Sequence, residues 1–227
     1  MPYTGITQQA LFLLSQNRFE DSKEFYDAHK AEIKAQVFTP LAQIMEALSD
    51  DFAGLDPQML LSPSKMSSRV RRDTRFTKDK RMYRDNVWLM FMRPKSEPML
   101  WPIMWFEIKP EEGWSAGVCV YDQTPKYMQF LRERFDEDFL AAADCAISAG
   151  AELEIEAFKK ERVSDCPENL KPYRNAKNFF LLHNSNDMEL LARAELVGRL
   201  RALYQAYHPM YRWLQAAAEE FLTEALI

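Results

Sequence analysis

The chain has 227 residues, a length that favours one domain, or one domain with an appendage, over two independent domains. Its apolar fraction of 47% and charged fraction of 28% are typical of a globular protein with a buried core. The net charge of −5 argues against a function based on general attraction to nucleic acid or anionic membranes, because such attraction selects for basic proteins.

Cysteine usage and hydropathy bear on the compartment. The three cysteines, Cys119, Cys145 and Cys166, are odd in number and have no paired spacing, which a reducing compartment allows. No apolar stretch approaches the 18 residues of a membrane span, and residues 1–21 lack the pattern of a signal peptide. We therefore expect a cytoplasmic protein without membrane association, organised as a single domain over residues 1–227.

The chain is predicted to begin with helices. Thr7 is a candidate N-cap for a short helix that ends near Ser15. Asp21, followed three residues later by Glu24, has the spacing of a capping box that starts a second, stronger helix. Pro40 is expected to kink or restart this helix, after which apolar residues continue at helical spacing.

The middle of the chain predicts a sheet. Residues 87–92 form a continuous apolar run, which is typical of a strand buried on both faces. Residues 103–108 and 114–121 have the pattern of two strands joined by a tight turn, and such a short connection requires an antiparallel pair. Residues 151–158 alternate between apolar and acidic side chains, as in a half-exposed strand, and residues 178–183 are predicted to form a fifth strand.

Helices are predicted again around and after these later strands. Residues 127–135 and 139–149 have amphipathic spacing, as do residues 196–207 and 210–221, which we expect to form two helices separated by Pro209. Helices at both ends and a meander of strands between them predict an α+β fold. Its mainly antiparallel sheet of about five strands would be covered by the N-terminal and C-terminal helices.

A basic segment precedes the first predicted strand. Residues 69–86 contain six Arg, two Lys and three Asp, which gives a local charge of +5 in an otherwise acidic chain. Arg outnumbers Lys, and a planar guanidinium can hold a carboxylate or phosphate through two parallel hydrogen bonds. Charge of this density must be neutralised by a bound anion or by carboxylates of the protein itself.

The first hypothesis is a site for a small anionic ligand, either a phosphate ester or a carboxylate. The side chains that would hold the anion are Arg69, Arg72, Arg75, Lys80 and Arg84. Tyr83 or Asp79 would orient the ligand or move protons. The sequence contains no nucleophile motif and no glycine-rich phosphate loop, so we assign no catalytic residue and expect no cofactor.

Two further hypotheses account for the same segment without a small ligand. In one, a non-catalytic interaction protein uses the basic loop to dock an acidic partner, and the acidic total charge makes nucleic acid the less expected partner. In the other, the segment forms a purely structural network of ion pairs. Its candidate pairs are Arg75 with Asp79 and Arg72 with Asp73, with additional partners in the row Glu152, Glu154 and Glu156.

Metal binding is not predicted. His29, His183 and His208 are isolated in the sequence, and none has a second His or Cys four residues away. The row of glutamates at 152, 154 and 156 is more typical of a solvated strand face than of a cation site. The oligomeric state is left open.

The order of residues in the basic segment follows a known pattern. The matching groups are Ser68-Arg69, Arg72-Asp73-Thr74-Arg75-Phe76, Asp79-Lys80 and Tyr83-Arg84. This run resembles the signature of a widespread microbial family, the domain of unknown function 2461 family. Weaker likenesses flank it at Lys23-Glu24-Phe25-Tyr26 with His29-Lys30, Pro40-Leu41, and Ala116-Gly117 with Tyr121. The resemblance covers most of the chain, from about Thr7 to Asn186.

The chain departs from the family pattern at three positions. Phe25 stands where Trp is usual, Met82 where Pro is common, and Arg84 where Lys is usual. A guanidinium at position 84 does not fit a role that needs a compact or titratable amine. The family implies no known activity, so the resemblance indicates where a site lies without assigning its function.

Overall fold

The computed structural model describes residues 2–120 and 124–224. The chain folds into two compact units, each assembled from three segments. Unit 1 consists of Met1–Phe91, Trp105–Ser115 and Asn184–Arg201. Unit 2 consists of Met92–Met104, Ala116–His183 and Ala202–Ile227. The organisation as a single domain over residues 1–227 stays a prediction.

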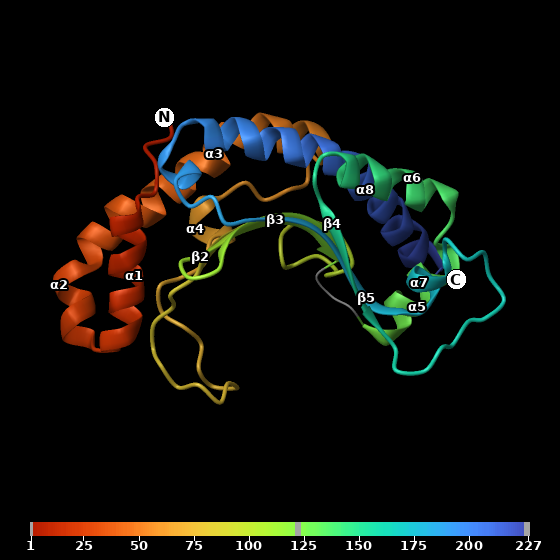
Figure 1. The fold of residues 1–227 in the computed structure, drawn as a ribbon, viewed down its shortest axis with the longest axis horizontal. Helices are drawn as coiled ribbons and strands as arrows, with labels where there is room; N and C mark the ends of the chain where they lie inside the picture. Colours follow the sequence, from red (N-terminus) through yellow and green to blue (C-terminus); the bar gives the residue numbers. More distant parts are fainter. Residues whose placement is uncertain (1, 121–123, 225–227) are drawn as a thin grey trace. The chain divides into compact units, whose positions relative to one another are not determined.

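A five-stranded antiparallel sheet confirms the predicted α+β class and the predicted number of strands (Figure 1). Its strand order is β1-β2-β3-β5-β4. The strands are β1 (Val87–Phe91), β2 (Pro102–Lys109), β3 (Gly113–Val120), β4 (Glu152–Ala157) and β5 (Ala176–Ser185). Tyr121, the last residue expected in the third strand, lies outside the described residues.

The first strand differs from its prediction. β1 lies at one end of the strand order, and burial alternates along it, with Trp88 and Met90 only half-buried. The expectation of a strand buried on both faces was therefore wrong. Beyond β1, Ser67 forms an isolated antiparallel bridge with Leu89, so the preceding loop pairs with the outer edge of this strand. An apolar run alone cannot distinguish a central strand from an edge strand whose second face is half-covered.

The turn between β2 and β3 brings charged side chains to one end of the hairpin. It contains Pro110, Glu111 and Glu112, and Lys109 at the end of β2 donates a hydrogen bond to Glu112. Gly113 adopts a φ of 118°, and a side chain there would collide with the carbonyl oxygen of Ser185. Glycine is therefore needed at this position to close the turn.

The first two helices confirm one predicted cap and correct another. Thr7 caps α1 (Gln8–Glu20), which continues past the predicted end at Ser15. Ser22 caps α2 (Lys23–Ile33) by accepting a hydrogen bond from the backbone of Phe25. Asp21 ends α1 in the left-handed conformation, with a φ of 44°. The capping-box interpretation of Asp21 was wrong, because its carboxylate has partners in a distant loop.

Pro40, which was predicted to kink or restart the helix, lies where the helix type changes within a continuous helical run. A π-helical segment, Lys34–Phe38, follows α2, and Pro40 then lies in the first turn of α3 (Thr39–Leu55). Proline is tolerated there because the first N–H groups of a helix have no partner within it. α3 buries its apolar face in the core of unit 1, where the ring of Phe52 stacks on Phe91 at 3.9 Å between centroids.

The last helix does not break at Pro209. α8 runs without interruption over Glu195–Glu224, although proline inside a helix costs about 3 kcal/mol. Side chains on both sides of the proline are fully buried, among them Tyr207, Met210 and Tyr211. Packing on both sides of Pro209 therefore offsets the lost backbone hydrogen bond, and the prediction of two separate helices was wrong.

Three further helices complete unit 2: α5 (Pro125–Arg134), α6 (Glu137–Ser148) and α7 (Lys171–Arg174). Phe135 and Phe139 pack edge-to-face on Phe179 of β5. In unit 1, short elements at α4 (Pro63–Met66) and η2 (Leu190–Ala192) connect the larger ones. Among the described helices, none is both long enough and apolar enough to span a bilayer.

Candidate functional site

The basic segment forms a long two-legged loop between α4 and β1, drawn in golden yellow in Figure 1. Arg71 and Tyr83 form an antiparallel bridge, flanked by hydrogen bonds from Arg72 to Met82 and from Arg84 to Val70. Side chains alternate between faces in such a ladder. Arg72 and Arg84 therefore share one face of the ladder as diagonal neighbours, and Tyr83 points to the other.

The end of α1 holds the second leg of this loop. The Asp21 carboxylate accepts hydrogen bonds from the backbone N–H groups of Met82 (2.6 Å) and Tyr83 (3.3 Å). One turn earlier in the helix, Arg18 donates to the carbonyl of Tyr83 at 2.8 Å. The left-handed turn at Asp21 thus aims its side chain at the loop, which is why this residue does not cap α2.

Tyr83 is a packing residue in this arrangement. Its side chain is buried, and its ring stacks on Tyr26 at 5.1 Å between centroids. Burial raises the pKa of Tyr83, so the phenol is protonated at neutral pH. Tyr83 does not line the cleft described below, and its role in orienting a ligand stays a prediction.

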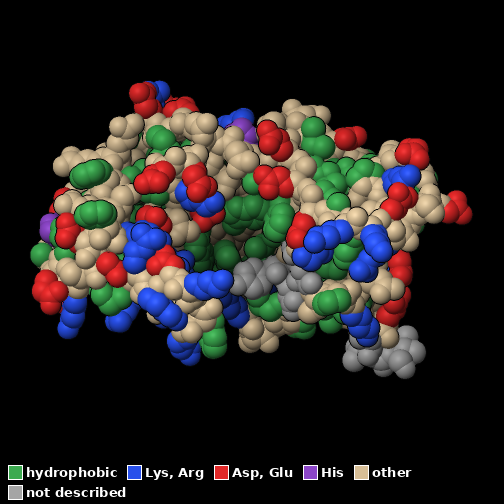
Figure 2. Space-filling model, turned by 60° about the horizontal axis from the view of Figure 1, so that its bottom comes forward, with side chains coloured by type: hydrophobic (Ala, Val, Ile, Leu, Met, Phe, Trp, Pro, Cys, Tyr) green, Lys and Arg blue, Asp and Glu red, His purple; other side chains and the backbone are tan. Residues whose placement is uncertain are grey.

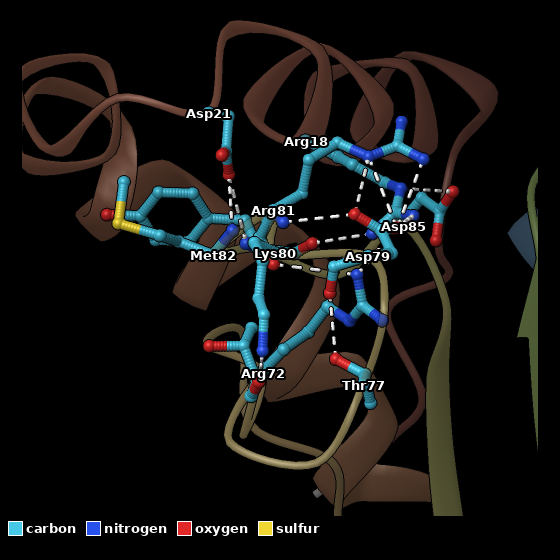
Figure 3. A network of polar contacts seen from close by, with 11 residues as sticks. Arg18, Asp21, Arg72, Thr77, Asp79, Lys80, Arg81, Met82 and Asp85 are labelled. Carbon is cyan, nitrogen blue, oxygen red and sulfur yellow. Dashed lines mark hydrogen bonds and ion pairs between the residues drawn. The ribbon is translucent and has the colours of Figure 1, made fainter.

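Asp79 is the centre of a network of charged groups (Figure 3). Its carboxylate accepts from three guanidiniums, at 2.8 Å from Arg18, 2.8 Å from Arg72 and 3.1 Å from Arg81. The hydrogen bond from Arg81, with further contributions from the Arg81 backbone and from Arg72, holds the pKa of Asp79 well below its ordinary range. Asp79 is therefore a fixed negative charge that positions Arg18 and Arg72.

This network predicts a pH dependence of stability. Because the folded-state pKa of Asp79 is depressed, its contribution is complete well above the ordinary value of 3.8 and is lost as pH falls below it. We expect the Tm of the wild-type protein, measured by circular dichroism, to fall more steeply between about pH 5 and pH 2 than that of Asp79→Asn. The difference should shrink in high salt because Asp79 is partly exposed. Parallel Tm profiles for the two proteins would contradict this role.

The tip of the loop lies apart from this network. Arg75 pairs with Asp73 at 2.6 Å, and the hydrogen bond from Arg75 lowers the pKa of Asp73 to about 2. Lys80 donates to the backbone carbonyl of Thr74. Phe76 is 91% exposed. The contacts of Arg75 and Lys80 therefore stay within the loop tip and stabilise it.

The ion pairs differ from those proposed for a structural network. Arg75 pairs with Asp73, where Asp79 was expected, and Arg72 pairs with Asp79, where Asp73 was expected. Glu156, which was named among the possible additional partners, pairs with Lys177 on the neighbouring strand β5. The expected pairings were wrong because the loop folds back on itself and takes partners from α1, a fold that sequence proximity does not reveal.

A cleft of about 340 Å³ lies beside the network, and we call it the Arg84 cleft. Its walls come from α1, both legs of the loop, the end of β2 and the β2–β3 turn. They comprise Ser15, Arg18, Arg72, Arg84, Asp85, Asn86, Lys109, Pro110, Glu111 and Glu112. Of the seven residues predicted from the sequence, the cleft brings together Arg72 and Arg84, with Asp79 bonded to Arg72.

Arg84 lines this cleft and has an unsatisfied polar group among the described residues. Its Nε is buried and has no hydrogen-bond partner within residues 2–120 and 124–224. Burial lowers the pKa of Arg84, and the neighbouring charges of Arg72 and Arg18 lower it further, although Glu107 and Asp85 oppose this. A buried donor without an acceptor costs about 1–3 kcal/mol, so this position favours a negatively charged oxygen.

Arg69 faces a different cleft. That cavity, of about 470 Å³, is lined by Tyr26, Lys30, Phe38 and neighbouring residues of α2 and the π-helical segment. Arg69 does not line the Arg84 cleft. Its predicted contact with a shared anion therefore has no geometric basis at the Arg84 cleft.

Two cationic residues of the Arg84 cleft were missed in the sequence. Arg18 belongs to α1, and Lys109 lies at the end of β2. Neither has a local signal, because each is an isolated basic residue at the end of a regular element. Only the antiparallel turn after Lys109 and the packing of α1 bring them to residues 72 and 84.

Charges of both signs share the face drawn in Figure 2, and His29 and His183 make hydrogen bonds to backbone carbonyls. Figure 2 shows Lys and Arg side chains interspersed with Asp and Glu. The described residues contain no group of three or more His, Cys, Asp or Glu that could hold a metal ion. His29 stacks on Phe25 at 4.1 Å and donates from Nδ1 to its carbonyl. Nδ1 of His183 likewise donates to the carbonyl of Gly150.

Comparison with known proteins bears on the family. A family model described as conserved hypothetical protein (DUF2461) matches residues 9–213, which confirms the resemblance seen in the basic segment. No curated protein and no solved structure matches the chain.

Proposed function

The chain belongs to the family of conserved hypothetical proteins (DUF2461), and we propose that it binds a small anionic ligand, a phosphate ester or a carboxylate, in the Arg84 cleft. The observation that carries the proposal is the buried Nε of Arg84, which has no acceptor among the described residues and lies near two further guanidiniums. An anionic oxygen in the cleft would reduce the repulsion among Arg84, Arg72 and Arg18, and a small shift of the Arg84 side chain would bring the buried Nε to it. Hydrogen bonds to charged groups contribute about 1.5–3 kcal/mol each.

The cleft is organised before any ligand arrives. Asp79 holds Arg18 and Arg72, whose side chains are only 15% and 16% exposed. Arg18 is also paired with Asp85 at 3.0 Å. Side chains that are already fixed lose little conformational entropy when an anion binds, which favours affinity.

The charge of the cleft favours a ligand with one or two negative charges. Four cationic side chains in its walls, Arg18, Arg72, Arg84 and Lys109, face three acidic ones, Asp85, Glu111 and Glu112. A nucleic-acid backbone needs a row of unpaired cations, and these acidic groups would repel it. We therefore do not propose nucleic acid as a partner. We also assign no catalytic residue.

The purely structural hypothesis explains Asp79 and leaves Arg84 without an explanation. A network that served stability alone would normally give a buried donor an acceptor, although the Nε of Arg174 is also unsatisfied among the described residues. The docking hypothesis has its own support in Phe76, whose exposed ring lies 5.6 Å from the guanidinium of Arg75. A loop tip of this kind suits an acidic partner, and Phe76→Ser would abolish capture of such a partner while leaving small-anion binding unchanged.

The proposal includes a cytoplasmic location. It is supported by Cys119, Cys145 and Cys166, none of which forms a disulfide. Unpaired thiols are typical of a reducing compartment.

Calorimetric titration tests the proposal. Inorganic phosphate, methyl phosphate and acetate are titrated into the full chain at low and at moderate salt. We expect saturable binding of at least one probe, with a salt dependence far shallower than that of a protein docked on a polyanion. Absence of saturable heat with all three probes, together with an unchanged Tm in their presence, would refute small-anion binding.

A further inference from the structure

An apolar groove adjoins the Arg84 cleft. The groove has a volume of about 370 Å³, and its apolar walls are Leu11 and Phe12 of α1, Pro110 of the β2–β3 turn, and Met188. It shares Ser15, Pro110 and Glu111 with the Arg84 cleft. The two cavities therefore meet along α1 and the turn, with cations gathered in one and apolar side chains in the other.

Phe12 is exposed at this groove. The residue is 68% exposed, although its neighbours Leu11 and Leu13 are buried. A large exposed ring in the wall of a cavity has apolar area to bury against a ligand. Phe19 lies seven residues further on α1 and is 84% exposed, but it does not line the groove. This pair of residues provides a test position and a matched control on the same helix.

From this arrangement we infer that the ligand of the Arg84 cleft is an amphipathic anion, whose apolar chain or ring lies in the groove beside Phe12. The inference rests on the proposed function, because the anionic head is held by Arg84 and its neighbours. From Arg18 to Leu11 the helix rises about 10 Å, so the groove extends the site by more than the size of a head group. Acidic Glu111 lies at the junction, where it would disfavour a second anionic group on the chain.

Two homologous series test the inference. Methyl, butyl, hexyl and octyl phosphate, and the matching alkyl carboxylates, are titrated calorimetrically below their aggregation concentrations. We expect affinity to rise about twofold to fourfold for each added methylene until the groove is filled. The two series also distinguish a phosphate head from a carboxylate head.

The variants Phe12→Ser and Phe19→Ser then test whether the alkyl chain of the ligand lies beside Phe12. Phe12→Ser should flatten the dependence on chain length and leave methyl phosphate binding unchanged, whereas Phe19→Ser should retain the wild-type dependence. An unchanged Tm in both variants would show that the fold is intact.

The outcomes separate the two levels of the proposal. If methyl phosphate binds and affinity does not depend on chain length, the inference is overturned and the proposed function stands. If the affinity of Phe12→Ser still rises with alkyl length, the alkyl chain does not lie beside Phe12 and the inference is overturned. It is also overturned if sedimentation shows a dimer that Phe12→Ser dissociates, because a second copy would then cover the groove. If no probe binds, the proposed function fails as well.

Discussion

We expect Arg84→Met to weaken binding of methyl phosphate by about 10-fold to 100-fold, the loss that corresponds to one charge-assisted hydrogen bond. Met keeps most of the length and apolar volume of the Arg stem and removes the guanidinium. The Nε of Arg84 is a buried donor without a partner in the described part of the chain, so Arg84→Met takes away the group that the anion would satisfy. Calorimetric Kd values for the variant and the wild-type protein measure the effect.

Arg69→Met is the matched control. Arg69 belongs to the same basic segment and faces the other cleft, so its loss should leave methyl phosphate binding within about twofold. Equal weakening by both variants would show that affinity follows total charge and not the Arg84 cleft.

Stability of the Arg84→Met variant separates ligand binding from a purely structural network. Arg84 is repelled by Arg72 and Arg18, and burial disfavours its charge. We therefore expect Arg84→Met to keep or raise the Tm, because an unfavourable buried charge is removed. A clear drop in Tm, with no ligand that restores it, would favour the structural hypothesis.

The largest effect on folding is expected at Asp21. Asp21→Ala should lower the free energy of unfolding by about 2–4 kcal/mol, because two backbone N–H groups lose a charged acceptor. These are the amides of Met82 and Tyr83. Alanine must also adopt the left-handed conformation at the end of α1, which adds about 1–2 kcal/mol of the total. Urea unfolding measures the change, with equal m-values indicating unchanged compactness.

Two further substitutions divide this loss into its parts. Asp21→Asn keeps an acceptor oxygen and tolerates the left-handed conformation, so it should be the mildest. Asp21→Gly removes the acceptor and relieves the backbone strain, so it should fall between Asn and Ala. Hydrogen exchange at Met82 and Tyr83 should be faster in the Ala and Gly variants. Unchanged exchange at both amides would show that Asp21 does not hold the loop.

Local patterns were sufficient where neighbouring residues decide the structure. Thr7 caps α1 because its hydroxyl reaches an amide three residues ahead, a contact that depends on the helix alone. The hairpin of β2 and β3 follows from two alternating runs separated by a short turn, which leaves an antiparallel pair as the only connection. At both sites the partners are close in sequence, so composition and spacing contain the answer.

Local patterns failed where a distant partner competes. Asp21 and Ser22 are both good N-caps, and the choice of Ser22 depends on amides 61 and 62 residues away that hold the Asp21 carboxylate. Pro209 normally ends a helix, but side chains buried on both sides of it keep α8 continuous. In each instance tertiary packing outweighs a preference of about one to three kcal/mol.

The sequence by itself determined the α+β class, most of the regular elements, the family, and the position of a dense group of guanidiniums in residues 69–86. Only the tertiary structure decided which of these charges are neutralised within the protein. Asp79 forms ion pairs with Arg18, Arg72 and Arg81, whereas the Nε of Arg84 has no acceptor among the described residues. The physical reason is range: backbone preferences act over a few residues, whereas charge neutralisation depends on distances in space that the chain sets only when it folds.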